Sequence, residues 1–419
     1  MIIRILYTVL LSLAAPFLLY GLFRTKPGKP TIGKRWKEHF GFSDKLSHGN
    51  EPVWIHASSV GETIAVTQFI REFKKHNPKQ TILLTTTTPT GAKQAESLSE
   101  LVEHRYAPVD FPFAIKGFLK TFNPKKLLIV ETELWPNLIH YTHQAGIPIT
   151  VLNARLSEKS YLGYKRVLPI FSSMAQKLSR VLCQFEDDAE RFIKLGVPTA
   201  NVLITGSIKF DITITNESIL ASNKLRDTLG GSRPIWIAAS THAGEDELLL
   251  SAHSTILESR PDTLLIVVPR HPERFVDVTK LCAGKFTTIT RSSGEKVSLS
   301  TQVYVGDSMG EMMLLLGTAD ICFMGGSLLG KKVGGHNLLE PAALGLPTLT
   351  GPSYYNFKDV TNSLIEIGGC KVVNNSTEIA TAISEALNDQ MHLKEAGEAS
   401  KKFVKLNSGA VARTLAYIS

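Results

Sequence analysis

Short apolar runs alternate with amphipathic segments along most of the chain. In the first half, the apolar runs predict buried parallel strands at residues 53–55, 81–84, 127–130, 149–152, 181–183 and 202–204. Between them, apolar residues recur at helical spacing over residues 63–75, 113–122, 135–145 and 187–195. Alternating strands and helices are typical of a doubly wound α/β sheet, in which helices cover both faces of parallel strands.

The alternation stops after residue 210 and restarts at residue 235. A second series of strands is predicted at residues 235–238, 264–268, 287–289, 303–305, 321–324 and 348–350, followed by helices at 377–387 and 392–405. A chain of 419 residues is long enough for two domains. We predict an α/β protein with two Rossmann-like domains facing a cleft, over residues 25–210 and 233–419, joined by a linker over 211–232. The sequence leaves open whether the last helix crosses back to the first domain.

An apolar segment without charged residues precedes the first domain. Residues 5–23 are at the lower end of the length that crosses about 30 Å of hydrocarbon. Residues 24–45 then contain seven basic and two acidic residues, which supply +5 of the net charge of +8. We predict a membrane anchor over residues 1–24, with the basic flank on anionic headgroups of the membrane and the domains on the cytoplasmic side.

A cleaved signal peptide is the alternative interpretation of this segment, because residues 12–15 have small side chains suited to cleavage. Pro16 follows at once and the apolar run continues to residue 23, which favours the uncleaved anchor. Whether the anchor crosses the bilayer or inserts shallowly stays open. Since the positive charge follows the apolar segment and is not on the domains, the composition argues against a nucleic-acid binder.

Residues that bind metals or form disulfides are not clustered along the sequence. The cysteines are far apart and lack C-x-x-C spacing, which predicts reduced, buried thiols at Cys183, Cys282, Cys322 and Cys370. There is no D-x-D triplet, and the acidic run at 245–247 is interpreted as the solvated start of a helix. We therefore expect no metal cofactor. A donor with a monophosphate leaving group is favoured, because arginine, lysine and helix N-termini can neutralise it.

The strongest single motif follows the predicted strand at 321–324. Glycine pairs at 325–326 and 334–335 lead into a helix opening at 338–343. Glycine lets a backbone approach an anion closely, and free N–H groups at a helix start supply donors. Glu340 lies in or near the first helical turn, where its carboxylate can accept a hydrogen bond from a sugar hydroxyl. The alternative is an ordinary tight loop with an acidic first turn.

Carboxylates follow two strands of the first domain. Glu62 comes after the strand at 53–55, where it is a candidate general base if burial raises its pKa. An ordinary acidic residue at a helix start is the alternative, and His56 is interpreted as structural. Glu131 follows the strand at 127–130, and a supporting role in the cleft is predicted for it; Glu133 is expected to cap the next helix.

Basic side chains occur at two further strand ends. Lys209 lies near the interdomain crossing between apolar residues, where it can reach an anionic donor group; a solvated lysine is the alternative. Arg270 follows Pro269 at the end of the strand at 264–268 and is predicted to bind phosphate with paired donors. Arg274 is interpreted as a structural ion-pair partner. Residues 306–312 form another strand–glycine–helix opening, in which Glu311 suits a nucleotide base or ribose.

Taken together, these stretches resemble the 3-deoxy-D-manno-octulosonic acid (Kdo) transferases of Gram-negative bacteria. The resemblance covers essentially the whole chain. It rests on the motifs Ser59-Val60-Gly61-Glu62, Glu131-Thr132-Glu133-Leu134-Trp135-Pro136, Asn153-Ala154-Arg155-Leu156-Ser157, Gly206-Ser207-Ile208-Lys209-Phe210-Asp211, Pro269-Arg270-His271-Pro272-Glu273-Arg274, Gly306-Asp307-Ser308-Met309-Gly310-Glu311 and Gly335-His336-Asn337-Leu338-Leu339-Glu340-Pro341-Ala342.

The resemblance implies a GT-B glycosyltransferase fold and transfer of Kdo from CMP-Kdo to the lipid A precursor lipid IVA. It implies that Glu62 is the general base and that Glu131 and Lys209 stabilise the transition state. The segments implied to contact CMP are Pro269-Arg270, Met309-Gly310-Glu311 and Asn337-Leu338-Leu339-Glu340. We expect an inverting, metal-independent enzyme of lipopolysaccharide biosynthesis.

Two other functions remain open from the sequence. One is a nucleotide-sugar epimerase of similar two-domain build, which would act on a soluble substrate. The other is a membrane-tethered nucleotide sensor without catalytic turnover. The sequence does not indicate the number of Kdo residues added, the hydroxyl specificity toward the acceptor or the oligomeric state.

Overall fold

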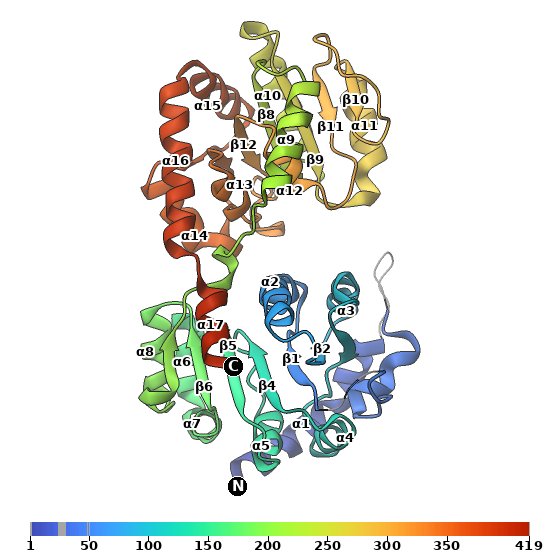
Figure 1. Cartoon of the computed structure of the whole chain (residues 1–419), viewed down its shortest axis with the longest axis vertical. Coiled ribbons are helices and arrows are strands. Elements are labelled where there is room, and N and C mark those ends of the chain that lie inside the picture. Colours follow the sequence, from blue (N-terminus) through green and yellow to red (C-terminus); the bar gives the residue numbers. More distant parts are fainter. Residues whose placement is uncertain (1, 24–30, 48, 50, 419) are drawn as a thin grey trace. The chain divides into compact units, whose positions relative to one another are not determined.

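Two seven-stranded parallel sheets organise the chain (Figure 1). The computed structural model describes residues 2–23, 31–47, 49 and 51–418. Unit 1 comprises Met1–Asp211 and Ser408–Ser419, and unit 2 comprises Ile212–Asn407. The chain therefore returns to unit 1 at its end, where helix α17 (Ala410–Ile418) packs.

The sheet of unit 1 has the strand order β3-β2-β1-β4-β5-β6-β7. Its strands are β1 (Val53–His56), β2 (Ile82–Thr86), β3 (Glu103–Tyr106), β4 (Lys126–Val130), β5 (Ile149–Ala154), β6 (Arg180–Cys183) and β7 (Val202–Ile204). Successive side chains point to opposite faces, so Trp54 and Leu127 join one core while Ile55 and Leu128 join the other. Because both faces are covered, the inner strands are mostly apolar, as predicted.

Helices cover both faces of this sheet. The helices α4 (Pro112–Phe122), α5 (Pro136–Gln144), α7 (Leu168–Ala175) and α8 (Glu186–Lys194) contribute to the core that contains Trp54, whereas α2 (Val60–His76), α3 (Pro89–Ala95) and α17 contribute to the other. Unit 1 also contains α1 (Ile2–Phe23), α6 (Glu158–Arg166) and the 3₁₀ helices η1 (Gly33–Phe40), η2 (Glu96–Leu98), η3 (Thr199–Asn201) and η4 (Ile208–Phe210). Asp211 accepts hydrogen bonds from the backbone N–H groups of Gly409 and Val411, which fixes the start of α17 on this unit.

The sheet of unit 2 has the strand order β10-β11-β9-β8-β12-β13-β14. Its strands are β8 (Ile235–Thr241), β9 (Leu264–Pro269), β10 (Thr288–Thr290), β11 (Val303–Val305), β12 (Ile321–Met324), β13 (Thr348–Thr350) and β14 (Cys370–Val372). Its helices are α9 (Asn216–Thr228), α10 (Asp246–Ser259), α11 (Phe275–Ala283), α12 (Met312–Leu316), α13 (Leu339–Leu344), α14 (Lys358–Glu366), α15 (Ser376–Asn388) and α16 (Gln390–Asn407), with 3₁₀ helices η5 (Pro272–Arg274), η6 (Gly330–Lys332) and η7 (Tyr355–Phe357). In both sheets, β-strand order reverses next to the first strand, which is where ligands of such folds bind.

The prediction of a linker over residues 211–232 was wrong for most of its length. Helix α9 occupies 216–228 and packs in unit 2 against α12. Thr215 caps it by accepting a hydrogen bond from Ser218 N, and Arg226 donates to the Thr318 carbonyl at 2.6 Å. The helix exposes its polar face, so its few buried apolar residues, such as Leu225, gave a weak periodic signal.

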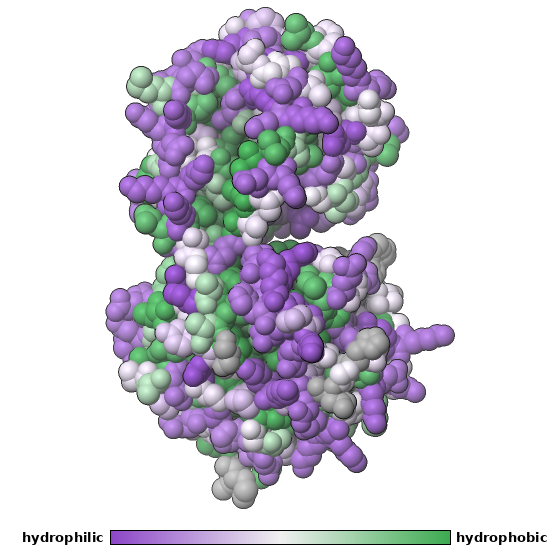
Figure 2. All heavy atoms as spheres, in the orientation of Figure 1, coloured by the Kyte–Doolittle hydropathy of each residue, from purple (hydrophilic) through white to green (hydrophobic). Residues whose placement is uncertain are grey.

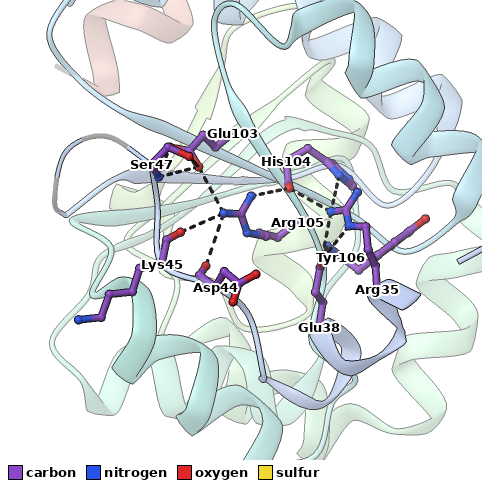
Figure 3. Close-up of polar contacts among 9 residues, drawn as sticks. All are labelled: Arg35, Glu38, Asp44, Lys45, Ser47, Glu103, His104, Arg105 and Tyr106. Atoms are coloured by element: carbon purple, nitrogen blue, oxygen red, sulfur yellow. Dashed lines mark hydrogen bonds and ion pairs between the residues drawn. The ribbon is translucent and has the colours of Figure 1, made fainter. Parts of the chain in front are cut away.

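Two edge strands, β3 and β14, were not predicted. Strand β3 has the sequence Glu-His-Arg-Tyr, which lacks the apolar pattern of the inner strands. Figure 3 shows why it forms: η1 and the following loop bind to this edge. Arg35 pairs with Glu38 at 2.7 Å and donates to the His104 carbonyl at 3.0 Å, and Glu38 accepts from Tyr106 N at 2.7 Å.

These contacts change the interpretation of the basic flank. Arg35 is held by Glu38 and by β3, so it contributes to the fold of unit 1, whereas Lys34, Lys37 and Lys45 are exposed. The other basic residues of the flank at positions 24, 26 and 29 lie outside the described residues.

Helix α1 begins the described chain and lies beside α5 and α7 of unit 1 (Figure 1). In the part of the chain that the structure describes, no helix is long and apolar enough to cross a membrane. All four cysteines are buried and free, which confirms the prediction of buried thiols.

Candidate active site

Glu62 lies at the carboxyl end of β1, in the first turn of α2. Ser59 is the N-cap and accepts a hydrogen bond from Glu62 N at 3.3 Å. The Glu62 carboxylate accepts hydrogen bonds from Ser58 N at 2.7 Å, Ser58 Oγ at 3.0 Å and Ser59 Oγ at 2.9 Å. This reciprocal capping fixes the carboxylate at the strand end.

Burial sets the proton affinity of this carboxylate. The side chain is only 8% exposed, and burial raises the pKa of Glu62 to about 7 although the serine hydrogen bonds lower it. The nearby negative charge of Glu133 raises it further. A carboxylate with this pKa can take a proton near neutral pH, as the prediction of a general base requires.

Glu131 and Lys209 form an ion pair in unit 1. Their Oε1 and Nζ atoms are 2.8 Å apart, and each side chain is about a third exposed, at 28% and 36%. Glu131 follows β4 with a φ of 61°, a left-handed conformation that costs a residue other than glycine about 1 kcal/mol or more. The predicted supporting residues therefore lie together, and the strained backbone aims Glu131 at Lys209.

Asn153 positions Lys209 from the neighbouring strand. It is fully buried at the end of β5, also has a positive φ of 52°, and its Oδ1 accepts a hydrogen bond from Ile208 N at 3.1 Å. Its Nδ2 has no hydrogen-bond partner within the described residues. No role was predicted for Asn153. An asparagine at a strand end was the only hint in the sequence, because asparagine adopts positive φ more readily than most residues.

Two predictions for neighbouring residues had different outcomes. His56 is buried, as expected of a structural histidine: its Nδ1 lies 3.0 Å from Thr85 Oγ1, its Nε2 has no hydrogen-bond partner among the described residues, and burial lowers its pKa to about 4. Glu133 does not cap α5, because its carboxylate accepts from Trp135 Nε1 at 3.1 Å. Asp110, which no sequence motif indicated, caps α5 by accepting from Asn137 N at 3.0 Å and Leu138 N at 2.6 Å.

In unit 2 the glycine-rich loop after β12 does surround an anion, but this anion is part of the protein. The Glu245 carboxylate accepts hydrogen bonds from the backbone N–H groups of Gly326 at 2.7 Å and of Ser327 and Leu328, each at 2.9 Å. Glu245 is fully buried, and Asp246 is nearly so and pairs with Arg274. The interpretation of 245–247 as solvated was therefore wrong for Glu245 and Asp246 and right for Glu247, which is exposed, whereas the structural role of Arg274 is confirmed.

The second half of the same loop leads to residues that remain available to a ligand. Arg270 is exposed after β9, and its side chain has no hydrogen-bond or ion-pair partner among the described residues. Burial raises the pKa of Glu340, and the positive charge of Arg270 partly offsets this increase. The side chains of Glu340 and Arg270 are therefore close enough to interact electrostatically. Asn337 Oδ1 accepts from Leu339 N at 3.1 Å, and Leu338 and Leu339 are buried.

A histidine pair lies in this region and was not predicted. His242 follows β8, and its Nε2 is 2.8 Å from Nε2 of His336. Burial lowers the pKa of both imidazoles, to about 4 for His336. Both rings are therefore neutral near pH 7, one donating and one accepting. The histidines are far apart in sequence, so only the sheet brings them together.

Glu311 is less available than predicted. It forms an ion pair with Arg291 at 2.9 Å, which lowers its pKa, and also accepts a hydrogen bond from Ser308 Oγ. Met309 is exposed, and Gly310 has a φ of 81°, which glycine adopts without strain. The backbone of this turn, the Met309 side chain and the ion pair, whose two side chains are about a third exposed, can therefore meet a ligand.

The strand ends of unit 2 thus offer cationic and neutral polar groups, and those of unit 1 offer a proton acceptor. Among the described residues, no group of three or more histidine, cysteine, aspartate or glutamate side chains could hold a metal ion. Two parallel α/β sheets with ligand groups at the carboxyl ends of their strands define the architecture of GT-B-like nucleotide-sugar enzymes.

Comparisons with known proteins agree with this class. The chain is similar over 88% of its length to all of the structure of UDP-GlcNAc 2-epimerase from Neisseria meningitidis, at a TM-score of 0.58 and 14% identity, which concerns the fold alone. Residues 232–403 match the family of glycosyl transferases group 1. Residues 34–212 match the family described as 3-deoxy-D-manno-octulosonic-acid transferase (kdotransferase).

The full-length relatives specify the family further. The chain is 40% identical to the 3-deoxy-D-manno-octulosonic acid transferase of Haemophilus influenzae, over 98% of this chain and 97% of the relative. It is 30% identical to that of Bordetella pertussis, over 87% and 86% of the two chains. The chain belongs to the Kdo transferase family, and the enzyme is a glycosyltransferase that transfers Kdo.

Proposed function

We propose that the enzyme transfers Kdo from CMP-Kdo to lipid IVA in lipopolysaccharide biosynthesis, with inversion at the anomeric carbon and without a metal ion. The observation that carries this proposal is the carboxylate of Glu62. It is held by three hydrogen bonds at a strand end and has a pKa of about 7. The N-terminal membrane anchor belongs to this proposal as well.

Glu62 acts as the general base. It removes the proton from an acceptor hydroxyl as the hydroxyl oxygen attacks the anomeric carbon of Kdo. The bond from that carbon to the phosphate oxygen breaks on the opposite side, and CMP leaves with the electron pair. The proton stays on Glu62 until solvent takes it.

Cationic side chains stabilise the charges of the donor. Arg270 is exposed and without a partner among the described residues, so its paired N–H donors suit the CMP phosphate. Lys209 offsets the carboxylate of Kdo, and Glu131 holds Lys209 in position at 2.8 Å. The Met309-Gly310-Glu311 turn and Asn337-Leu338-Leu339-Glu340 complete the CMP site. Glu340 accepts a ribose hydroxyl.

The body of the protein works at the cytoplasmic side of the inner membrane. The acyl chains of lipid IVA stay in the bilayer while its phosphorylated sugars enter the active site. The exposed lysines Lys34, Lys37 and Lys45 support this placement, since anionic headgroups attract such residues.

The Glu62→Gln variant tests the proposal. Transfer from CMP-Kdo to lipid IVA, followed by mass spectrometry, is expected to fall by about 10² to 10⁴ fold, the usual contribution of a general base. Binding of CMP, measured by calorimetry, should not change. Glu72→Gln on the same helix is the matched control, because Glu72 pairs only with surface groups such as Lys75. Transfer by Glu62→Gln near the wild-type rate would remove Glu62 from this role, and rescue of chelated enzyme by a divalent ion would disprove metal independence.

A further inference from the structure

A cavity of about 590 Å³ lies in unit 1, among α1, α4, α5 and α7, and is separate from the residues assigned to transfer. Ile3 and Arg4 of helix α1 line it, and α1 lies beside α5 (Figure 1). Its lining includes Arg4 from α1, Lys116 from α4, His140 and Tyr141 from α5, and Lys177 after α7.

The charged groups around this cavity are mostly positive. The Arg4 guanidinium lies 4.9 Å from the centre of the Tyr141 ring, and Lys116 Nζ lies 4.8 Å from it. Arg4 Nη1 also donates to Asn137 Oδ1 at 2.9 Å and to the Tyr141 hydroxyl at 3.1 Å. Two cations on one aromatic ring repel each other unless an anion lies between them or close by.

Asp110, a carboxylate that interacts with Arg4, is already engaged by other groups. Asp110 accepts hydrogen bonds from the two N–H groups at the start of α5 and from the Tyr7 side chain. Burial, and after it the charge of Arg4, lowers the pKa of both Lys177 and His140. Within the described part of the chain, no acidic neighbour opposes these effects on Lys177 and His140. The cavity therefore has an excess of positive charge.

The outer face of α1 indicates what lies next to the cavity. Leu6, Leu10, Leu13 and Phe17 recur along the helix and are between 57% and 81% exposed. The opposite face carries Arg4 and Thr8, which bind to Asn137. A helix with its polar side on the protein and an apolar stripe outward suits the boundary between lipid headgroups and acyl chains.

We propose that the cavity binds the phosphate of an anionic membrane phospholipid, with the apolar stripe of α1 in the adjoining lipid. The occupant is a phospholipid because a soluble phosphate would match the cations but leave the apolar stripe in water. The site deepens the membrane association proposed above and lies outside the transfer machinery.

Vesicle binding by the whole chain tests this site. The double variant Lys116→Gln/Lys177→Gln is compared with Lys79→Gln/Lys125→Gln, which removes two exposed lysines of unit 1 that do not line the cavity. Sedimentation with vesicles of phosphatidylcholine and phosphatidylglycerol should show about a 25-fold loss of affinity for the cavity variant, from about fivefold for each of the two lysines at an anionic surface. The control should change by less than about threefold, because exposed charges away from the membrane are screened. A phospholipid with a photoreactive headgroup should crosslink to α1, α5 or the end of α7.

Each other outcome contradicts the proposal. An equal loss in both double variants would indicate diffuse surface charge, and no loss in either would exclude a role for the cavity. Protection from crosslinking by millimolar inorganic phosphate would identify soluble phosphate as the ligand. Protection by lipid IVA but not by phosphatidylglycerol would assign the cavity to the acceptor. Circular dichroism and CMP binding check that the variants fold, and both are independent of whether Glu62 is the base.

Discussion

Replacing Glu245 with glutamine tests how the glycine-rich loop of unit 2 is held. One carboxylate oxygen accepts hydrogen bonds from Ser327 N and Leu328 N, both at 2.9 Å, and the other accepts from Gly326 N at 2.7 Å and His242 N at 3.1 Å. In glutamine one of these oxygens becomes an amide NH₂ group, which faces two N–H donors. Two charge-assisted hydrogen bonds are then lost in a fully buried position.

The magnitude follows from those two bonds. A hydrogen bond to a charged group contributes about 1.5 to 3 kcal/mol, so Glu245→Gln should lower the free energy of opening the loop by about 3 to 6 kcal/mol. Because Gly335 N donates to the Gly326 carbonyl at 2.8 Å, the part of the loop that precedes Asn337 should loosen as well. Affinity for CMP should fall with it.

Hydrogen exchange read by mass spectrometry measures this opening directly, in peptides that cover residues 325–340. Glu247→Gln is the matched control, since Glu247 is exposed two positions further along the same helix opening. The reasoning is refuted if the free energy of opening measured for Glu245→Gln stays within about 1 kcal/mol of the wild-type value, or if Glu247→Gln lowers it as much as Glu245→Gln does.

Three other results are expected. The pKa of Glu62 is raised from 4.5 to about 7, so kcat/KM should fall about tenfold for each pH unit below pH 7. Because the folded protein holds this proton more tightly than the unfolded chain, the free energy of unfolding should decrease as the pH rises from 4.5 to 7. The Glu62→Gln variant should show neither pH dependence. Lys209→Met should reduce transfer strongly but change the free energy of unfolding by about 1 kcal/mol or less, because its ion pair with Glu131 is part-exposed; a large loss of stability by denaturant titration would contradict this. Asp211→Asn should weaken the cap of α17 by about 1 to 2 kcal/mol and increase proteolysis after residue 407, whereas unchanged protease resistance would count against the cap.

A second cavity, in unit 2, has no assigned ligand. It has a volume of about 770 Å³ and lies among α9, α16 and the loops before β12 and β13. Figure 2 shows hydrophobic residues on this face of unit 2 around α9 and α16. Its lining includes Ile219, Leu316 and Leu346, together with Lys394 and Lys401. These residues lie at the amino ends of the strands, away from the ends that carry Arg270.

Local sequence was most informative where buried strands alternate with helices. Strand β1 and helix α2, with Ser59 at the N-cap and Glu62 in the first turn, follow from an apolar run and from the helical spacing of the apolar residues after it. The same logic failed at β3 and at α9. Strand β3 is stabilised by Arg35 and helix α9 by the contact of its Arg226 with Asp320, and in both cases the two partners are distant in the chain. Neither segment has a strong apolar periodicity.

Electrostatic roles were harder to predict than positions. Glu133 and Asp110 are both acidic residues near the start of α5, and sequence proximity favoured the wrong one. Glu245 was expected in solvent because charged runs at helix starts usually are, yet the loop after β12 supplies the N–H groups that make its burial favourable.

By itself, the sequence determined the two parallel α/β sheets, the family and the placement of Glu62, Glu131 and Arg270 at strand ends. These features depend on periodicity and on short motifs, which act within a few residues. Only the tertiary structure decided which groups are charged, paired or available: the pKa of Glu62, the occupation of the glycine loop by Glu245 and the excess of cations beneath α1. Those properties depend on burial and on partners far along the chain, and the free energy of a charge is set by the groups packed around it.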